Sequence, residues 1–234
     1  MSGLRIESLP GRVFRAVLFD VDGTLYDAKP MRRAMMRSLL AALLRRPFAM
    51  RRRLRALSAY RKALEALRCE APCDLRAEQL RRAAEASALE EDELAQVVDE
   101  WMGQRPLRFL PRSRRPGLLP FLAELENWAV PCGAFSDYPV RHKLEALAVA
   151  EFFAVQLDAN DERIRSLKPQ PKGLVVGAAE LGVPIGELLY IGDRAEVDAA
   201  AAKAAGAGCV LIGRGEGEPR FADFGALLAE LLPE

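Results

Sequence analysis

Short apolar segments alternate with helical patterns through the second half of this 234-residue chain. Apolar runs typical of buried strands cover residues 130–135, 153–157, 188–191 and 209–212. Helical patterns lie between and around them, at residues 118–128, 140–148, 173–181, 195–205 and 224–232. Because parallel strands are joined through long crossovers, usually helices, this alternation predicts a parallel sheet with helices on both faces. The expected fold class is therefore α/β, with a doubly wound, Rossmann-like parallel sheet.

A long helical block interrupts this alternation after the first predicted strand, residues 13–19. From Pro30 to about Gln104, apolar residues recur at intervals of three and four, which is the period of a helix with one buried face. Pro47 breaks the first helix, and Asp74 is suited to cap a later one through its carboxylate. We expect an inserted, all-helical cap domain of residues 28–112 and a core domain of residues 1–27 and 113–234.

The charge distribution supports two structural units. Residues 29–115 carry 21 Lys/Arg against 11 Asp/Glu, a net charge of +10, and the rest of the chain carries −9. Residues 29–62 contain twelve basic residues and no acidic one. A basic helical surface of this kind either attracts anionic substrates or binds an anionic partner.

Several classes of protein are disfavoured by composition. The N-terminal segment lacks the apolar core of a signal peptide, and no apolar stretch reaches membrane-spanning length. The four cysteines are scattered, and the Cys69/Cys73 spacing is not that of a zinc pair. His142 is the only histidine, which excludes a histidine-rich metal site. We expect a cytoplasmic protein that does not enter a membrane.

The segment FDVDGTLYD, residues 19–27, contains two carboxylates at the end of the first predicted strand. Asp20 and Asp22 point to the same side of an extended chain because side chains repeat with period two. Two like charges this close repel each other unless a positive group lies between them. The pattern therefore predicts a bound cation.

Polar side chains also follow the other predicted strands. Ser136 follows one strand, Lys168 lies in a turn after the next, and Asp193 and Asp198 follow a third. In open parallel sheets such residues gather at the carboxyl edge, where ligands bind. Carboxylates, a hydroxyl and an ammonium are the groups that hold a phosphoryl group beside Mg²⁺. Each signal is weak alone, but together and in this order they indicate a phosphoryl-transfer site.

At these positions the chain resembles the haloacid dehalogenase (HAD) superfamily of phosphohydrolases over nearly its full length. The matching motifs are DVDGT with Asp20, Asp22 and Thr24, Ser136 after a strand, Lys168 before a proline, and GDRAEVD with Asp193 and Asp198. Members with a helical cap insert it after the first motif, where the helical block begins here.

The resemblance implies a role for each matching residue. Asp20 would be the nucleophile that forms an aspartyl-phosphate, and Asp22 the general acid and then base, with a raised pKa. Mg²⁺ would be held by Asp20, Asp193 and the backbone carbonyl of Asp22. Thr24, Ser136, Asp137 and Lys168 are the expected phosphate contacts. Asp198 would orient the lysine or metal-bound water.

Three residues depart from the usual motifs of this family. Arg194 and Val197 stand where the fourth motif commonly has serine and asparagine, and Asp137 stands where asparagine often follows Ser136. None removes a primary catalytic group. An additional acid at Asp137 lies near the expected phosphate pocket, where it can weaken anion binding or alter the metal site.

The resemblance leaves more than one activity open. The principal hypothesis is a Mg²⁺-dependent phosphatase acting on a small phosphorylated metabolite, as a monomer or homodimer. Dehalogenases usually lack the second aspartate, so Asp22 argues against that activity, and phosphonate cleavage would need a cap lysine, for which only Lys29 and Lys62 are available. A sugar-phosphate mutase remains an alternative. A protein that binds nucleic acid, lipid or a partner through its basic helices is a second alternative, and nucleic acid is disfavoured because the catalytic set is complete.

Overall fold

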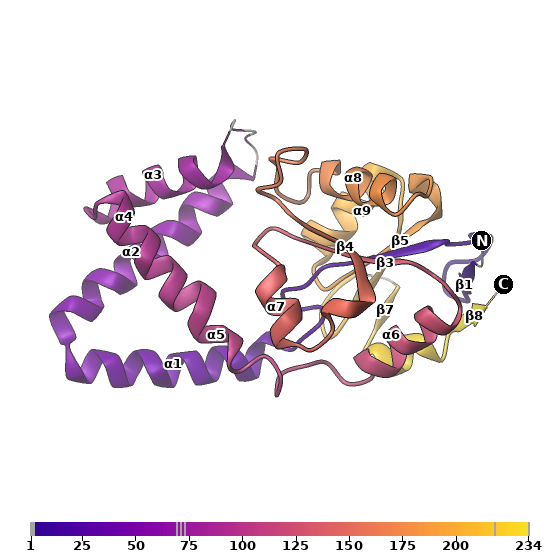
Figure 1. Ribbon diagram of the computed structural model, residues 1–234, viewed down its shortest axis with the longest axis horizontal. Helices are drawn as coiled ribbons and strands as arrows, with labels where there is room; N and C mark the ends of the chain where they lie inside the picture. The colour runs from indigo at the N-terminus through magenta and orange to yellow at the C-terminus, as the bar shows by residue number, and fades with distance from the viewer. Residues whose placement is uncertain (1–2, 69, 71, 73, 218, 234) are drawn as a thin grey trace. The chain divides into compact units, whose positions relative to one another are not determined.

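The computed structural model describes residues 3–68, 70, 72, 74–217 and 219–233. The chain divides into two compact units, one formed by the chain up to Asp27 together with the chain from Arg114 onward, the other by Ala28–Ser113 (Figure 1). We propose that these units are the core and cap domains expected from the sequence. Cys69 and Cys73 lie outside the described residues.

A six-stranded parallel sheet forms the centre of the core unit. Its strand order is β4-β3-β2-β5-β6-β7, and every neighbouring pair is parallel. The strands are β2 (Ala16–Phe19), β3 (Cys132–Ser136), β4 (Phe153–Asp158), β5 (Leu188–Gly192), β6 (Gly208–Ile212) and β7 (Arg220–Phe221). Every residue of β2, β3 and β5 is buried, as expected for strands covered on both faces.

Two consecutive residues of β2 show how the sheet is covered. Leu18 belongs to an apolar cluster with α8 (Lys172–Glu180) and α9 (Ala200–Ala205) on one face. Phe19 points to the other face, where its ring lies 6.1 Å from those of Phe121 in α6 (Leu118–Asn127) and Phe224 in α10 (Phe224–Leu228). The remaining helical segments of this unit are α7 (Arg141–Ala146), η2 (Ala150–Phe152), η3 (Ile185–Glu187) and η4 (Ala195–Ala199). The predicted doubly wound parallel sheet is confirmed.

In the second unit, helices are the only regular secondary structure among the described residues. It contains α1 (Ala28–Arg45), α2 (Pro47–Leu67), α3 (Leu75–Ser87), α4 (Glu91–Val98), η1 (Asp99–Gln104) and α5 (Arg105–Leu107). Pro47 opens α2, and Asp74 caps α3 by accepting the N–H of Ala77 at 2.9 Å, as the sequence predicts. The apolar side chains of α2, α3 and α4 form one cluster, around Tyr60, Ala83 and Leu94.

The two chain ends differ from the sequence expectation. The last helix ends at Leu228, not near residue 232, and Leu231–Pro233 forms β8. This strand pairs antiparallel with β1 (Leu4–Ile6), which the sequence does not predict. Strands of three residues are too short to show a period, and the two leucines before Pro233 continue the apolar pattern of the preceding helix.

No described helix is both long enough and apolar enough to cross a membrane.

Candidate functional site

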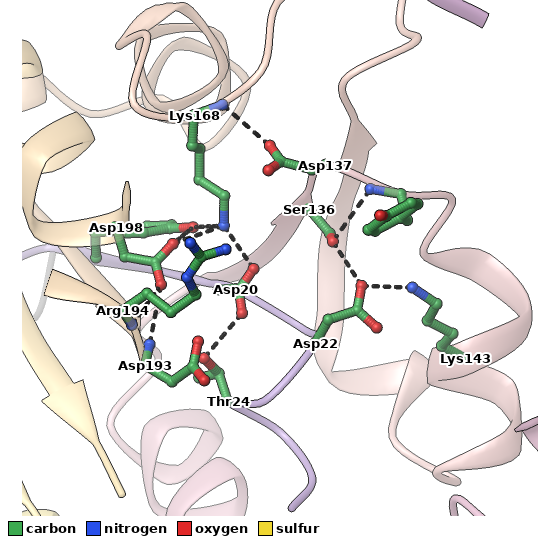
Figure 2. A network of polar contacts seen from close by, with 12 residues as sticks. Asp20, Asp22, Thr24, Ser136, Asp137, Lys143, Lys168, Asp193, Arg194 and Asp198 are labelled. Carbon is green, nitrogen blue, oxygen red and sulfur yellow. Dashed lines mark hydrogen bonds and ion pairs between the residues drawn. The ribbon is translucent and has the colours of Figure 1, made fainter. Parts of the chain in front are cut away.

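The site lies at the carboxyl ends of β2, β3 and β5 in the core unit. Because β2 lies between β3 and β5 in the sheet, Asp20 directly after β2, Ser136 at the end of β3 and Asp193 directly after β5 lie at the ends of three adjacent strands (Figure 2). The N–H of Asp20 donates to the carbonyl of Ile191 at 2.8 Å, which extends the pairing of the two strands to the first aspartate. The sheet thus brings together residues that are far apart in the sequence.

Lys168 is the buried cation of the site. Its Nζ donates to Asp20 Oδ1 at 2.6 Å, to Asp198 Oδ1 at 2.7 Å and to the Tyr190 hydroxyl at 2.9 Å. Its side chain is 3% exposed. Burial by itself would lower the pKa of Lys168, but the carboxylates of Asp198 and Asp20 outweigh burial and raise the pKa well above that of a free lysine. The ammonium is therefore charged at neutral pH.

Asp137 and Asp198 hold this lysine in place. The backbone N–H of Lys168 donates to Asp137 Oδ1 at 3.0 Å. Asp198 Oδ2 accepts the N–H groups of Asp193 and Arg194, both at 3.0 Å, while its Oδ1 accepts the ammonium. Asp198 therefore links the lysine to the loop after β5. Asp137, which was expected at the phosphate, is used here to fix the backbone of the lysine turn.

Asp22 points away from this buried cluster (Figure 2). Its Oδ2 accepts the Ser136 hydroxyl at 3.0 Å and the Lys143 ammonium at 2.5 Å, and its Oδ1 accepts the Tyr26 hydroxyl at 2.5 Å. Burial raises the pKa of Asp22, but Lys143 and these hydrogen bonds outweigh burial and lower it. A general acid at this position is expected to have a raised pKa, and the difference arises from Lys143, a cation that the motif does not contain.

Asp193 completes an acidic cluster with Asp20 and Asp198. One carboxylate oxygen of each lies within 4.8 Å of the others. Asp193 Oδ1 is buried and has no hydrogen-bond donor among the described residues. Burial, followed by the charge of Asp198, raises the pKa of Asp193 to about 6. Burial likewise raises the pKa of Asp20, with Asp198 and Asp193 adding to it and Lys168 opposing it. The raised pKa values of Asp20 and Asp193 indicate that nearby positive groups do not fully compensate these carboxylates. A bound cation would supply the missing positive charge.

Two glycines allow the loops to approach this closely. Gly23 has φ +104°, and a Cβ there would overlap the carboxylate of Asp193. A Cβ on Gly192 would overlap the side chain of Asp198. The glycine of the first motif is therefore required by both its backbone conformation and the space it leaves for Asp193.

The structure also shows the contacts of Thr24 and the surroundings of Arg194, Val197 and His142. The Thr24 hydroxyl donates to Asp20 Oδ2 at 2.9 Å, so it orients the carboxylate that was predicted to be the nucleophile. Arg194 Nε donates to Glu196 at 2.8 Å and its side chain is 44% exposed, whereas Val197 is buried. His142 is exposed beside Glu145, in agreement with the surface role expected for it.

Sequence reasoning missed several residues that contact the predicted set. Arg115 donates through Nε to the carbonyls of Gly23 at 3.2 Å and Thr24 at 3.1 Å, which braces the first motif. Tyr190 contacts Lys168, and Tyr26 and Lys143 contact Asp22. Tyr26 lies four residues after Asp22 within the segment FDVDGTLYD, so the sequence carries a local signal for it. Nothing local marks Lys143 or Arg115.

Comparison with known proteins agrees with this geometry. A family model described as a haloacid dehalogenase-like hydrolase matches residues 14–206, which include every predicted site residue. The chain belongs to the haloacid dehalogenase-like hydrolases. The prediction of a phosphatase-like member of this superfamily, and of a hydrolase, is confirmed.

Curated relatives of this HAD-like hydrolase are named as phosphatases. The chain is 29% identical over 203 residues to the phosphoglycolate phosphatase of Shigella boydii serotype 4, covering 82% of this chain and 78% of that protein. It is also 29% identical over 245 residues to the glyceraldehyde 3-phosphate phosphatase of Methanopyrus kandleri, covering 90% of each.

Solved structures share the fold at lower identity. The 2-haloacid dehalogenase from Pseudomonas syringae pv. tomato superimposes with a TM-score of 0.62 at 21% identity, covering 92% of this chain and 97% of that chain. A HAD phosphatase from Thermococcus onnurineus gives a TM-score of 0.61 at 21% identity, with the same coverage. These similarities confirm the HAD fold of this chain, in which the helical segment follows β2.

Proposed function

We propose that this HAD-like hydrolase is a Mg²⁺-dependent phosphatase that cleaves a small phosphate monoester through an aspartyl-phosphate on Asp20. The observation that carries the proposal is the separation of the two carboxylates of the first motif. Asp20 lies with Lys168, Asp193 and Asp198, whereas Asp22 lies with Ser136 and Lys143. One carboxylate is placed among groups that bind a phosphoryl group and a cation, and the other lies outside that cluster, where it can exchange a proton with the leaving group once it is protonated.

The donor set fits a hard divalent cation. Asp20 and Asp193 supply carboxylate oxygens, and Asp193 Oδ1 is buried without a hydrogen bond from the described residues. Asp198 has both oxygens engaged by hydrogen bonds and serves better as support for the site. By analogy with the family, the backbone carbonyl of Asp22 would be a further ligand. A bound Mg²⁺ would neutralise repulsion between Asp20 and the anionic substrate.

The nucleophile and the phosphate contacts have separate tasks. Asp20 attacks phosphorus with one carboxylate oxygen while the Thr24 hydroxyl holds the other. Lys168 binds a phosphoryl oxygen and compensates its charge, and Asp137 and Asp198 fix the lysine for this purpose. Ser136 is nearly completely buried and its hydroxyl reaches Asp22, so it can turn toward a second phosphoryl oxygen.

Asp22 then acts on the leaving group and on water. It donates a proton to the departing alcohol oxygen and later removes one from the water that cleaves the aspartyl-phosphate. Its lowered pKa makes it a carboxylate in the free protein. It must therefore take up a proton as the substrate binds, when the added negative charge of the phosphate makes protonation more favourable.

The relatives indicate the size of the substrate. Their names specify phosphoglycolate and glyceraldehyde 3-phosphate, both small phosphate monoesters. We infer a substrate of this class for the present chain.

A turnover assay with matched variants tests the proposal. The wild type should release phosphate from small monoesters in Mg²⁺ and lose this activity in excess EDTA. Asp20→Asn should abolish turnover, whereas Asp158→Asn, the same change at the end of β4, should leave it nearly unchanged. Full activity in EDTA would refute the metal requirement, and normal turnover by Asp20→Asn would refute the covalent route.

A further inference from the structure

A second ammonium stands beside the site on its outer side. Lys143 comes from α7 and its Nζ lies 2.5 Å from Asp22 Oδ2. The pair is partly exposed, 16% for the Lys143 side chain and 28% for that of Asp22. Lys168 and Asp20 form a comparable pair that is almost completely buried, at 3% and 5%. The two lysines therefore mark an inner and an outer part of the same site.

In the proposed mechanism Lys168 binds the phosphoryl group, whereas Lys143 has no contact with the substrate assigned to it. Lys168 already supplies the positive charge that the transferred phosphoryl group needs. Asp22 donates its proton to the leaving oxygen, so that oxygen must come within about 3 Å of the carboxylate. Because Lys143 Nζ lies 2.5 Å from the same carboxylate, the part of the substrate that carries the leaving oxygen lies next to this ammonium.

Lys143 can move away from Asp22 without leaving that carboxylate unpaired. Asp22 retains the hydroxyls of Ser136 and Tyr26 as hydrogen-bond donors. The lysine itself is supported by the ring of Tyr138, whose centroid is 5.3 Å from Nζ. An exchange of one carboxylate partner for another keeps the ammonium paired throughout.

From this geometry we propose that Lys143 binds a carboxylate on the alcohol portion of the substrate and so selects phosphate monoesters of hydroxy acids over neutral ones. This inference rests on the proposed phosphatase function and adds the substrate class to it. A carboxylate carries a single charge, which one ammonium compensates. A carboxylate one or two carbons from the leaving oxygen is within reach of Nζ.

The test compares two substrates of similar size. 2-Phosphoglycolate carries a carboxylate, and 2-hydroxyethyl phosphate carries a neutral hydroxymethyl group in its place. Lys143→Met should lower kcat/KM for 2-phosphoglycolate about 10- to 100-fold, mainly through KM, as expected for losing a charged hydrogen bond. Because loss of the Lys143–Asp22 ion pair acts on both substrates alike, the deciding quantity is the ratio of the two kcat/KM values, which should fall about 10- to 100-fold in Lys143→Met. Lys143→Arg should retain most of the preference.

Arg141→Met is the matched control. Arg141 lies on the same helix but is 81% exposed beside Glu145, so its removal takes away one charge without touching the site. It should leave both substrates unaffected. Equal losses on both substrates in Lys143→Met would mean that the lysine only holds Asp22 and would overturn the inference, as would no loss on either.

A binding measurement separates this inference from the proposed function. In the Asp20→Asn background, the dissociation constant of 2-phosphoglycolate measured by calorimetry should rise about 10- to 100-fold when Lys143→Met is added. If the wild type hydrolyses neither phosphate but this rise is found, the phosphatase proposal fails while carboxylate recognition stands. If hydrolysis occurs and binding does not depend on Lys143, the phosphatase proposal stands and carboxylate recognition by Lys143 is refuted.

Discussion

The two aspartates of the first motif show how neighbouring charges set the behaviour of identical residues. Burial raises the pKa of both carboxyls. At Asp20 the nearby carboxylates add to this effect, and the pKa remains raised despite Lys168. At Asp22 the ammonium of Lys143 and the surrounding hydroxyls reverse it. Two residues apart in sequence, the side chains have opposite shifts because their carboxylates face different partners.

Asp193 offers a test of the cation site that does not depend on activity. In the proposed site its buried carboxylate repels Asp20 and Asp198 when no metal is bound. Asp193→Asn should therefore raise the melting temperature in EDTA relative to the wild type. Mg²⁺ should raise the melting temperature of the wild type and have little effect on the variant. Differential scanning calorimetry in both buffers measures these values.

Protonation of Asp193 determines how the stability of the metal-free protein changes with pH. The pKa of Asp193 is raised to about 6, above its usual 3.8, so the folded protein without metal holds this proton more tightly than the unfolded chain. This contribution to stability is present below pH 3.8 and is lost as the pH rises through about 6. Mg²⁺ binding needs the deprotonated form, so its stabilising effect should shrink between pH 7 and pH 5. A Mg²⁺ effect that stays constant over this range would contradict the assignment of Asp193 as a ligand.

Among the elements, β2 determines where the chemistry can occur. Its four residues are apolar and buried, with Leu18 and Phe19 directed to opposite faces of the sheet. Because both its neighbours also run parallel to it, the loops after three adjacent strands meet at one edge. The helix α7 adds Lys143 to this edge, and the segment leading into α6 adds Arg115.

In the helical unit, the start of α3 allows a prediction about capping. Asp74 accepts the N–H of Ala77 at 2.9 Å and satisfies a backbone donor that the helix itself leaves unpaired. Asp74→Ala should lower the free energy of unfolding of this unit by about 1 kcal/mol. Urea unfolding in a Trp128→Phe background measures it, because the remaining tryptophan, Trp101, is buried in the same unit.

Asp74→Asn is the control for this measurement. Asparagine caps helices about as well as aspartate, so this variant should lose only a few tenths of a kcal/mol. An equal loss in both variants would mean that the charge of Asp74, and not its cap hydrogen bond, supports the helix.

At the scale of the whole molecule, the two units carry opposite net charge. Most acidic residues of the helical unit are used in ion pairs, for example Glu78 with Arg81 and Arg82, and Glu100 with Arg105. The excess basic residues lie on α1 and α2, where many are exposed. Such a surface attracts anions over a distance that is limited by salt, about 8 Å at physiological ionic strength.

We therefore predict a salt-dependent association with anionic substrates. The kcat/KM for a multiply charged phosphate should fall as NaCl increases, and more steeply than that for a minimally charged aryl phosphate. A variant with Arg32, Arg33 and Arg37, all exposed on α1, changed to Gln should flatten the salt dependence. Equal and flat responses for both substrates would mean that these arginines take no part in attracting the substrate.

The sequence by itself determined the order of the five longer core strands, β2 to β6, and of the helices between them, the all-helical character of the insertion and the family, but not the two-residue strand β7. This was possible because these features depend on local periodicity and on short motifs, both of which involve residues close together in the sequence. The burial of β2 and the capping of α3 by Asp74 followed from the same local rules. The prediction for the two chain ends was wrong because β1 and β8, of three residues each, are too short to show a period.

Only the tertiary structure decided how the predicted residues are connected. Asp22 and Lys143 are separated by 121 positions, and Asp20 and Lys168 by 148. The first contact is not part of the family motif, yet it lowers the pKa of Asp22 against expectation. Side-chain direction, burial and distance fix such interactions, and these arise only when strands and helices pack. A sequence pattern names the groups at the edge of a sheet, but their charges depend on which neighbours the fold places within a few ångströms.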